Sequence, residues 1–268
     1  MKTPVSYRIM QYNILHQRTG WGAEKYLSLG LPVRSGNVVK AIYEVNPDVL
    51  VLAERHDEWA GIPVDYSDTV DLAALLGSRY AFAEDRIEGG KTVNRTPIVY
   101  RTDRFRCVES GSVELGEEMP FERSQNKRVV SYAVLEDVSD SGSRGVRMVV
   151  FATHWSSGQP QALVNVQSVN MSRIIREVLA REDYARLPVV AAADFNAVYS
   201  NEAYRSLLSD CGLADADAAV NGAGAVQPIV DHIAIAGCTP ERFELVWTPY
   251  IEQASDHRPV YCDIKIGG

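Results

Sequence analysis

The sequence predicts an α+β fold in which two packed sheets, mixed or antiparallel, are flanked by helices. Short apolar segments rich in β-branched residues, typical of strands, alternate with longer amphipathic segments typical of helices. Several strand segments between Pro97 and Thr153 follow one another with no helical segment between them. A purely parallel, doubly wound sheet needs a helix after nearly every strand, so this succession argues against one.

Expected strands are short runs of β-branched and aromatic residues, and expected helices are amphipathic runs with a stop signal. The strands are residues 7–12, 49–53, 97–100, 105–113, 129–135, 146–153, 189–193, 229–235, 243–247 and 260–266. The helices are residues 34–44, 72–76, 162–180 and 202–209. The first helix ends before Asn46-Pro47 and the second stops at Gly77, while the fourth closes near Gly212.

Length and composition favour one domain spanning residues 1–268. The chain is 46% hydrophobic, enough for a substantial core. Residues 136–147 are rich in Ser, Gly and Asp, but they are few and lie between two strand segments, which indicates a surface hairpin loop rather than a linker.

The formal net charge of -8 is the wrong sign for a protein held on nucleic acid mainly by phosphate contacts. A local basic rim or a bound divalent cation would still allow such binding. The four cysteines form no CxxC pair, so we expect buried free thiols. No apolar run approaches the length of a membrane span. We expect a cytoplasmic monomer, or a secreted protein if a signal peptide precedes the sequence.

Polar groups follow or interrupt the apolar runs at the ends of the expected strands. Burying an unpaired carboxylate costs several kcal/mol, so such a set needs a metal, hydrogen bonds or a substrate to compensate it. The groups are Asn13, Glu54, His154, Asp194, Asn196, Asp231, His232, Asp256 and His257.

Each of these residues alone has a structural explanation. Asn13 and Asp194 fit turns or helix caps, and Glu54 fits an ion pair with Arg55. Asp231 and His232 could bond to one another or to backbone. Taken together, the groups indicate function, since three of the five histidines fall in these strand-end runs.

Taken in their order along the chain, these strand-end polar groups resemble the motifs of the endonuclease/exonuclease/phosphatase superfamily, also called deoxyribonuclease I-like. The resemblance spans Tyr12 to Val260, and it lies in six motifs at the ends of expected strands. It implies a four-layer α/β sandwich of two mixed sheets flanked by helices, and metal-dependent hydrolysis of a phosphoester.

The resemblance also implies a role for each motif residue. Glu54 matches the principal Mg²⁺ ligand, with Mn²⁺ as an alternative ion; Asn13 supports the metal or its waters, and Asp256 is a further acidic ligand or outer partner. Asp194 orients or deprotonates the attacking water, and Asn196 donates to the phosphoryl oxygens.

The histidines of the motifs are expected on the phosphate. His154 and His257 would contact it from other sides, and Asp231 would orient His257 and favour its protonated form. We expect Asp194 and His257 to be the proton-handling pair, with the roles of acid and base left open between them.

Departures from the family pattern narrow the substrate. Thr153-His154-Trp155 resembles the branch with deoxyribonuclease I, sphingomyelinases, inositol-polyphosphate phosphatases and deadenylases rather than the abasic-site endonucleases. Leu15 replaces a second acidic residue found in several nucleases, and Ala193 replaces a common glycine. Further candidates for substrate contact are His56, Arg95, Arg128 and Trp155, although surface solvation is the simpler explanation for His56, Arg95 and Arg128.

Three functions remain in view. The first is a phosphodiesterase or phosphomonoesterase acting on a phosphorylated small molecule or lipid-derived substrate. The second is a nuclease acting on DNA or RNA, and the third is a catalytically inactive binding module, against which the intact motif set argues. Residues 114–127 could form a flap over the site or a plain surface loop.

Overall fold

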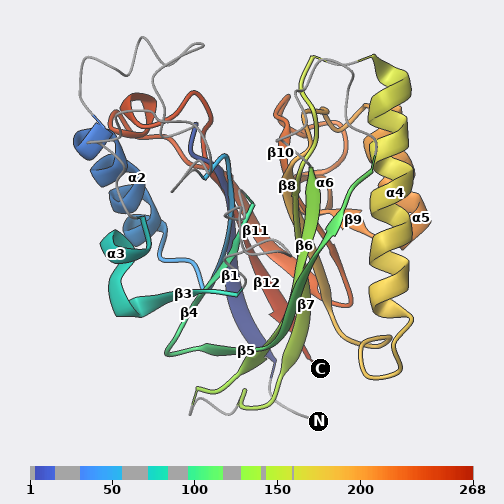
Figure 1. Ribbon diagram of the computed structural model, residues 1–268, viewed down its shortest axis with the longest axis horizontal. Coiled ribbons are helices and arrows are strands. Elements are labelled where there is room, and N and C mark those ends of the chain that lie inside the picture. Colours follow the sequence, from blue (N-terminus) through green and yellow to red (C-terminus); the bar gives the residue numbers. More distant parts are fainter. Residues whose placement is uncertain are drawn as a thin grey trace.

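Two six-stranded sheets pack face to face with helices on their outer sides (Figure 1). The computed structural model describes residues 4–15, 31–55, 72–83, 96–116, 128–139, 143–158 and 160–267. Both sheets are mixed, because each contains one parallel pair among antiparallel ones. This arrangement confirms the predicted fold class.

The first sheet has the order β11-β12-β1-β2-β4-β3. Its strands are β1 (Val5–Asn13), β2 (Val49–Ala53), β3 (Tyr80–Phe82), β4 (Ile98–Arg101), β11 (Thr239–Leu245) and β12 (Val260–Ile266). β1 is central and pairs in parallel with β2 and antiparallel with β12. The end of β1, the end of β2 and the start of β12 therefore lie at the same edge.

The second sheet has the order β5-β6-β7-β8-β10-β9. Its strands are β5 (Phe105–Glu114), β6 (Val129–Asp137), β7 (Arg147–His154), β8 (Val189–Asp194), β9 (Ala214–Asp215) and β10 (Asp231–Ala236). β7 and β8 are parallel, and β10 runs antiparallel to β8. The ends of β7 and β8 thus meet the start of β10.

The described helices divide between the two outer faces except the last, whose Ala216 lies in the layer between the sheets and which packs beside β10 and β11. They are α2 (Leu31–Val45), α3 (Leu72–Leu76), α4 (Gln161–Leu179), α5 (Glu202–Cys211) and α6 (Ala216–Asn221). Figure 1 shows α2 and α3 beside the first sheet, and α4 and α5 beside the second. Among the described residues, no helix is both long and apolar enough to cross a membrane.

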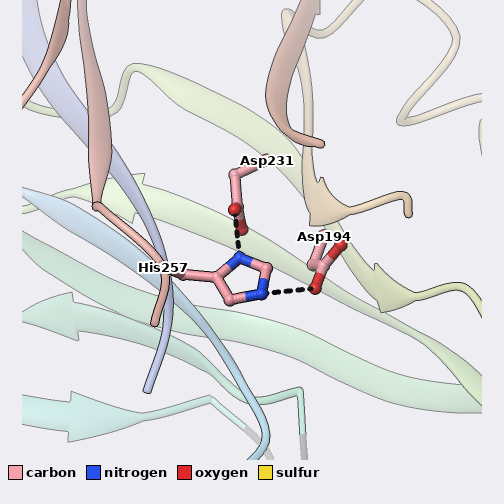
Figure 2. A group of neighbouring side chains, drawn as sticks. All are labelled: Asp194, Asp231 and His257. Atoms are coloured by element: carbon pink, nitrogen blue, oxygen red, sulfur yellow. Dashed lines mark hydrogen bonds and ion pairs between the residues drawn. The ribbon is translucent and has the colours of Figure 1, made fainter. Parts of the chain in front are cut away.

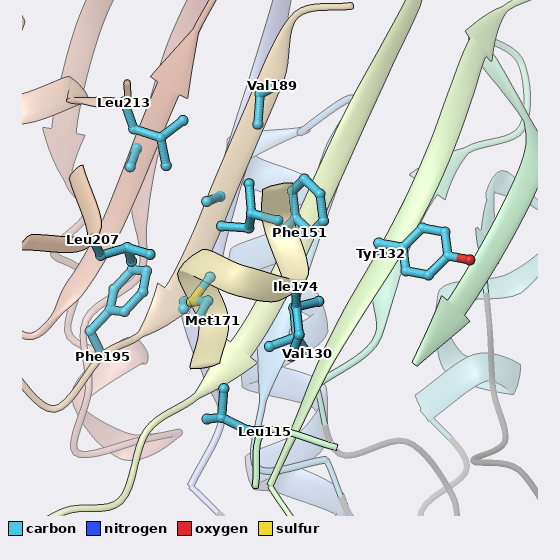
Figure 3. Close-up of a cluster of buried hydrophobic side chains, with 14 of the residues drawn as sticks. Leu115, Val130, Tyr132, Phe151, Met171, Ile174, Val189, Phe195, Leu207 and Leu213 are labelled. Carbon is cyan, nitrogen blue, oxygen red and sulfur yellow. The ribbon is translucent and has the colours of Figure 1, made fainter. Parts of the chain in front are cut away.

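Three apolar layers hold the sandwich together, and strand alternation assigns residues to them. Along β1, Tyr7 and Ile9 belong to the layer between the sheets, whereas Met10 and Tyr12 belong to the layer under α2. A third layer joins the second sheet to α4, where Met171 and the neighbouring turns pack on strand side chains (Figure 3). Positions 11 and 13 of β1 therefore also face the space between the sheets.

All the expected strands and helices are present; 49–53, 72–76 and 260–266 have the expected bounds, and each of the others has an end shifted by one to four residues. The expected strand 243–247 is instead β11, because pairing with β12 extends through charged positions such as Glu241 and Arg242 on an exposed edge. The sequence pattern missed β3, β9 and α6, which are too short for periodicity to register. The expected hairpin at 136–147 is confirmed by the antiparallel pairing of β6 with β7.

Candidate active site

Three titratable side chains form a row across the second sheet. His154 ends β7 and is registered beside Asp194 at the end of β8, which is registered beside Asp231 at the start of β10. Each lies two residues from a core residue that faces the other sheet, namely Ala152, Ala192 and Ile233 respectively, so it lies on the same face of its strand. The row is therefore the polar end of the layer between the sheets.

The first sheet brings Asn13 and Glu54 opposite this row. The Asn13 amide Nδ2 donates to Glu54 Oε1 at 3.1 Å and to Asp194 Oδ2 at 2.9 Å, which links the two sheets. Its oxygen accepts from the Leu15 amide at 2.9 Å. Since Nδ2 has two hydrogens, both are used to hold carboxylates.

His257 enters the site through a short turn before β12. The Ser255 hydroxyl donates to the Asn13 carbonyl at 2.7 Å and accepts from the His257 amide at 3.1 Å, so the turn is tied to the end of β1. The imidazole lies between two carboxylates (Figure 2). Its Nδ1 is 2.6 Å from Asp231 Oδ2, and its Nε2 is 3.8 Å from Asp194 Oδ2.

The surroundings of His257 and Asp194 raise the pKa values of both side chains. Burial disfavours the cation, but the hydrogen bond and charge of Asp231, aided by Asp194, raise the pKa of His257 to about 10. Burial, with the neighbouring charge of Asp231, raises the pKa of Asp194 to about 7 despite His257 and Asn13. At neutral pH the site therefore pairs a cationic imidazole with a carboxyl group close to its titration point.

The turn after β8 places Asn196 beside the row. Its backbone amide donates to Asp194 Oδ1 at 2.9 Å, and its side-chain Nδ2 donates to the Trp155 carbonyl at 2.8 Å. The amide group has a second N–H that this contact does not use. His154 completes the surroundings, with Nε2 at 3.3 Å from Asp194 Oδ2 and 3.9 Å from Glu54 Oε1.

The loops that carry the site also contain residues in strained backbone conformations. Positive φ angles are unusual outside glycine, and among the described non-glycine residues they occur at Leu15 (46°), Asn46 (54°), Glu54 (64°) and Asn196 (47°). Three of these four belong to the loops that carry the site. Such conformations cost about 1–3 kcal/mol each and persist where the surrounding contacts impose them, which is common at functional sites.

Solved structures share this architecture over the whole chain. An endonuclease/exonuclease/phosphatase family protein from Bacteroides thetaiotaomicron matches with a TM-score of 0.74 at 17% identity, covering 100% of this chain and 97% of that one. The human Nocturnin catalytic domain with bound sulfate matches at 0.70 and 20% identity, covering 98% and 97%. The chain has the endonuclease/exonuclease/phosphatase fold. No family model and no curated protein matches the sequence.

Two further structures with the endonuclease/exonuclease/phosphatase fold carry more specific names. A Bacteroides thetaiotaomicron mannosyl-6-phosphatase matches with a TM-score of 0.70 at 18% identity, covering 96% of this chain and 99% of that one. ANGEL2, a 2′,3′-cyclic phosphatase in complex with adenosine-2′,3′-vanadate, matches at 0.68 and 16% identity, covering 99% of each. The likeness extends to both sheets and their helices, because nearly all of each chain is covered.

Within the endonuclease/exonuclease/phosphatase fold, most predicted site residues converge. The residues that meet at one edge of the two sheets are Asn13, Glu54, His154, Asp194, Asn196, Asp231 and His257. Asp256 is exposed beside them, and its charge helps to raise the pKa of His257. His56 and Arg95 lie outside the described residues, as do residues 117–127 of the expected flap.

The prediction of Trp155 as a substrate contact is wrong. Its indole is completely buried and packs edge-on against Phe195 in the layer under α4, so it supports the site from within. Arg128 is half-buried at the start of β6, where its carbonyl accepts from the Leu115 amide. Its role in substrate contact stays a prediction.

Sequence reasoning missed two residues that complete the site. Gln11 Nε2 donates to Asp231 Oδ1 at 3.2 Å from the opposite sheet, and Ser255 holds the His257 turn. The signal for Gln11 was present, because it shares the inward face of β1 with Tyr7, Ile9 and Asn13. A polar residue at an inward position of an apolar strand needs a buried partner.

The raised pKa of Asp194 predicts a pH-dependent stability in metal-free protein. The folded value of about 7 exceeds the ordinary value near 4, so the folded state binds this proton more tightly and loses stability as pH rises from 4 to 7. Urea denaturation in EDTA should show wild type losing on the order of 3 kcal/mol relative to Asp194→Asn over this range. Parallel stability curves for the two proteins would contradict the prediction.

Proposed function

We propose that this chain is a divalent-metal-dependent phosphoesterase that hydrolyses a phosphodiester or phosphomonoester by attack of water on phosphorus. The observation that carries the proposal is the row His154, Asp194 and Asp231 facing Asn13 and Glu54 across the sheets. It brings proton-handling groups, donors for phosphoryl oxygens and a carboxylate for a cation to one edge of a rigid scaffold.

The donor set on the Glu54 side fits a hard cation. Mg²⁺ and Mn²⁺ prefer carboxylate, carbonyl and water oxygens. Glu54 would hold the ion, Asn13 would fix that carboxylate through Nδ2, and Asp256 would add outer negative charge. A bound ion would neutralise charge on a phosphoryl oxygen.

A second group of ligand atoms lies nearby. Asp194, Asp231 and His257 offer atoms within 4.8 Å of one another. Both nitrogens of His257 already face carboxylates, however, with Nδ1 in a short hydrogen bond. We therefore assign this group to proton handling and the ion to the side of Glu54.

The roles follow from charge and geometry. Asp194, whose pKa lies near 7, accepts a proton from the attacking water. His257, which Asp231 holds in the cationic form, faces the developing charge and supplies a proton to the leaving oxygen. The second N–H of Asn196 and the ring of His154 contact the phosphoryl oxygens from other sides.

A phosphorylated small-molecule or lipid-derived substrate suits this chain better than a polyanion. The net charge of -8 opposes binding through many phosphate contacts. A fold neighbour named as a mannosyl-6-phosphatase supports a small phosphorylated substrate.

A substrate screen tests the proposal. Purified protein is assayed with Mg²⁺, Mn²⁺ or EDTA against aryl phosphomonoesters and diesters, sugar phosphates, phospholipid headgroup esters, plasmid DNA and RNA. We expect metal-dependent hydrolysis of small phosphoesters that EDTA abolishes. Cleavage confined to nucleic acid would favour a nuclease, and full activity in EDTA would overturn the metal assignment.

Replacing Asp231 with asparagine should lower kcat by about 10- to 100-fold. The amide keeps the shape of the carboxylate but no longer favours the cation of His257, so the pKa of the imidazole should fall. As pH rises, kcat of the variant should therefore begin to fall at a lower pH than kcat of wild type. An unchanged profile would remove Asp231 from proton handling.

A further inference from the structure

The outer face of β10 carries a second polar cluster that the proposed chemistry does not use. Side chains alternate along a strand, so Asp231 faces His257 between the sheets while its neighbour His232 faces the helix layer. The imidazole of His232 is completely buried. A buried imidazole needs partners for its nitrogens, and both have them.

One of these partners belongs to the active-site turn. His232 Nε2 lies 3.1 Å from the carbonyl oxygen of Ala197, and Nδ1 lies 3.0 Å from Asp215 Oδ2. A carbonyl oxygen and a carboxylate both only accept, so Nε2 donates a proton to the Ala197 carbonyl and Nδ1 donates one to Asp215. His232 thus forms a hydrogen bond to the backbone one residue after Asn196.

The other side of the imidazole is fixed to the fold. Asp215 ends β9, which pairs with β10, and its Oδ1 caps α6 by accepting from the Ala218 amide at 2.8 Å. Its Oδ2 also accepts from the Tyr204 hydroxyl at 2.8 Å. The Tyr204 ring stacks on His232 with centroids 4.4 Å apart and planes 27° apart. These contacts leave the imidazole one orientation.

The turn to which His232 bonds contains an unfavourable backbone conformation, so it needs hydrogen bonds on both sides to hold it. β8 ends at Asp194, and Asn196 has a φ of 47°, a backbone conformation that residues other than glycine rarely adopt. The Phe195 amide donates to the Val230 carbonyl at 2.9 Å, which anchors the turn before Asn196. The His232 bond to Ala197 anchors it after Asn196.

We propose that His232 is a positioning residue, which fixes Asn196 and Asp194 for phosphoryl chemistry by holding the Ala197 carbonyl against the Asp215 network. The inference rests on the proposed function. It assigns His232 no contact with substrate, because the imidazole lies on the far face of β10. A shift of about 1 Å in reacting groups can cost on the order of 10²-fold in rate.

Two substitutions separate the two nitrogens of His232. The amide nitrogen of glutamine lies near the position of Nε2, whereas that of asparagine lies near Nδ1. H232Q therefore keeps a donor for Ala197, and H232N keeps one only for Asp215. Ser168→Ala is the matched control, since Ser168 makes the same kind of buried bond in the same layer, donating to the Ala203 carbonyl at 2.6 Å.

We expect H232N to lower kcat about 10- to 100-fold with little change in KM, because ground-state binding does not depend on the turn as strongly as the transition state does. H232Q should recover most of the loss. Ser168→Ala should lower the melting temperature while leaving kcat unchanged. Circular dichroism confirms that each variant is folded before it is assayed.

Hydrogen exchange supplies a readout that does not depend on activity. The amides of Phe195 and Asn196 should exchange faster in H232N than in wild type, H232Q or Ser168→Ala. Unchanged exchange and kcat in folded H232N, or equal losses in H232Q and H232N, would overturn the positioning role. If wild type hydrolyses no phosphoester, the proposed function fails, and the exchange data alone decide whether His232 holds the turn.

Discussion

Replacing Asp194 with asparagine should lower kcat for phosphoester hydrolysis by on the order of 10³-fold. The carboxylate stands at the centre of the site, where Oδ2 accepts from Asn13 and faces both His154 and His257. An asparagine keeps the volume but can no longer accept a proton from water. The rate at saturating substrate, measured with Mg²⁺ and with Mn²⁺, checks the prediction.

A buried aspartate at the other end of the sandwich serves as the matched control. Asp137 ends β6, is completely buried, and accepts from the Tyr7 hydroxyl at 2.7 Å and the Ser139 amide at 2.7 Å. Asp137→Asn should reduce stability through these bonds while leaving kcat of the folded protein near wild type. Equal losses of kcat in both variants would mean that Asp194 acts through folding alone.

Glu54→Gln should lower activity by about 10²- to 10³-fold and raise the Mg²⁺ concentration needed for half-maximal rate. Glutamine still offers Oε1 to the Asn13 amide, so the local hydrogen bond survives while the charge that attracts a cation is lost. Titrating Mg²⁺ at fixed substrate separates weaker metal binding from slower chemistry. If the variant reaches its half-maximal rate at the same Mg²⁺ concentration as wild type, Glu54 is not a ligand of the metal.

An exposed glutamate controls for the loss of charge itself. Glu177 lies on α4 in an ion pair with Arg173, with half or more of each side chain exposed. Glu177→Gln changes the net charge by the same amount as Glu54→Gln, but such a surface pair contributes at most about 1 kcal/mol. Its Mg²⁺ titration should superimpose on that of wild type.

Much of the site could be predicted from the sequence because its residues occupy the ends of strands with clear apolar patterns. Asp194 directly follows an unbroken apolar run, and Asn13 and His154 likewise close strands whose ends lie within two residues of the predicted ones. What the pattern lacks is the order of strands. β10 pairs with β8 across a stretch of 36 residues containing α5, β9 and α6, and this pairing alone sets Asp231 beside Asp194.

The errors have physical causes of the same kind. Trp155 follows a strand-end histidine, which made it a candidate for substrate contact, but the packing of Phe195 against it is set by tertiary structure. Predicting Gln11 needed its strand face, which alternation gives, and its partner on a distant strand, which alternation does not give. Short elements such as β3 and β9 owe their existence to pairing rather than to local propensity.

The most direct test of attack by water on phosphorus is hydrolysis of the best substrate from the screen in water enriched in ¹⁸O. We expect the phosphate-containing product to gain one ¹⁸O atom and the alcohol to gain none, with incorporation abolished in EDTA and slowed on the order of 10³-fold in Asp194→Asn. Label in the alcohol would place the attack on carbon rather than phosphorus. Label in the phosphate at an undiminished rate in Asp194→Asn would show that this cluster does not activate the water.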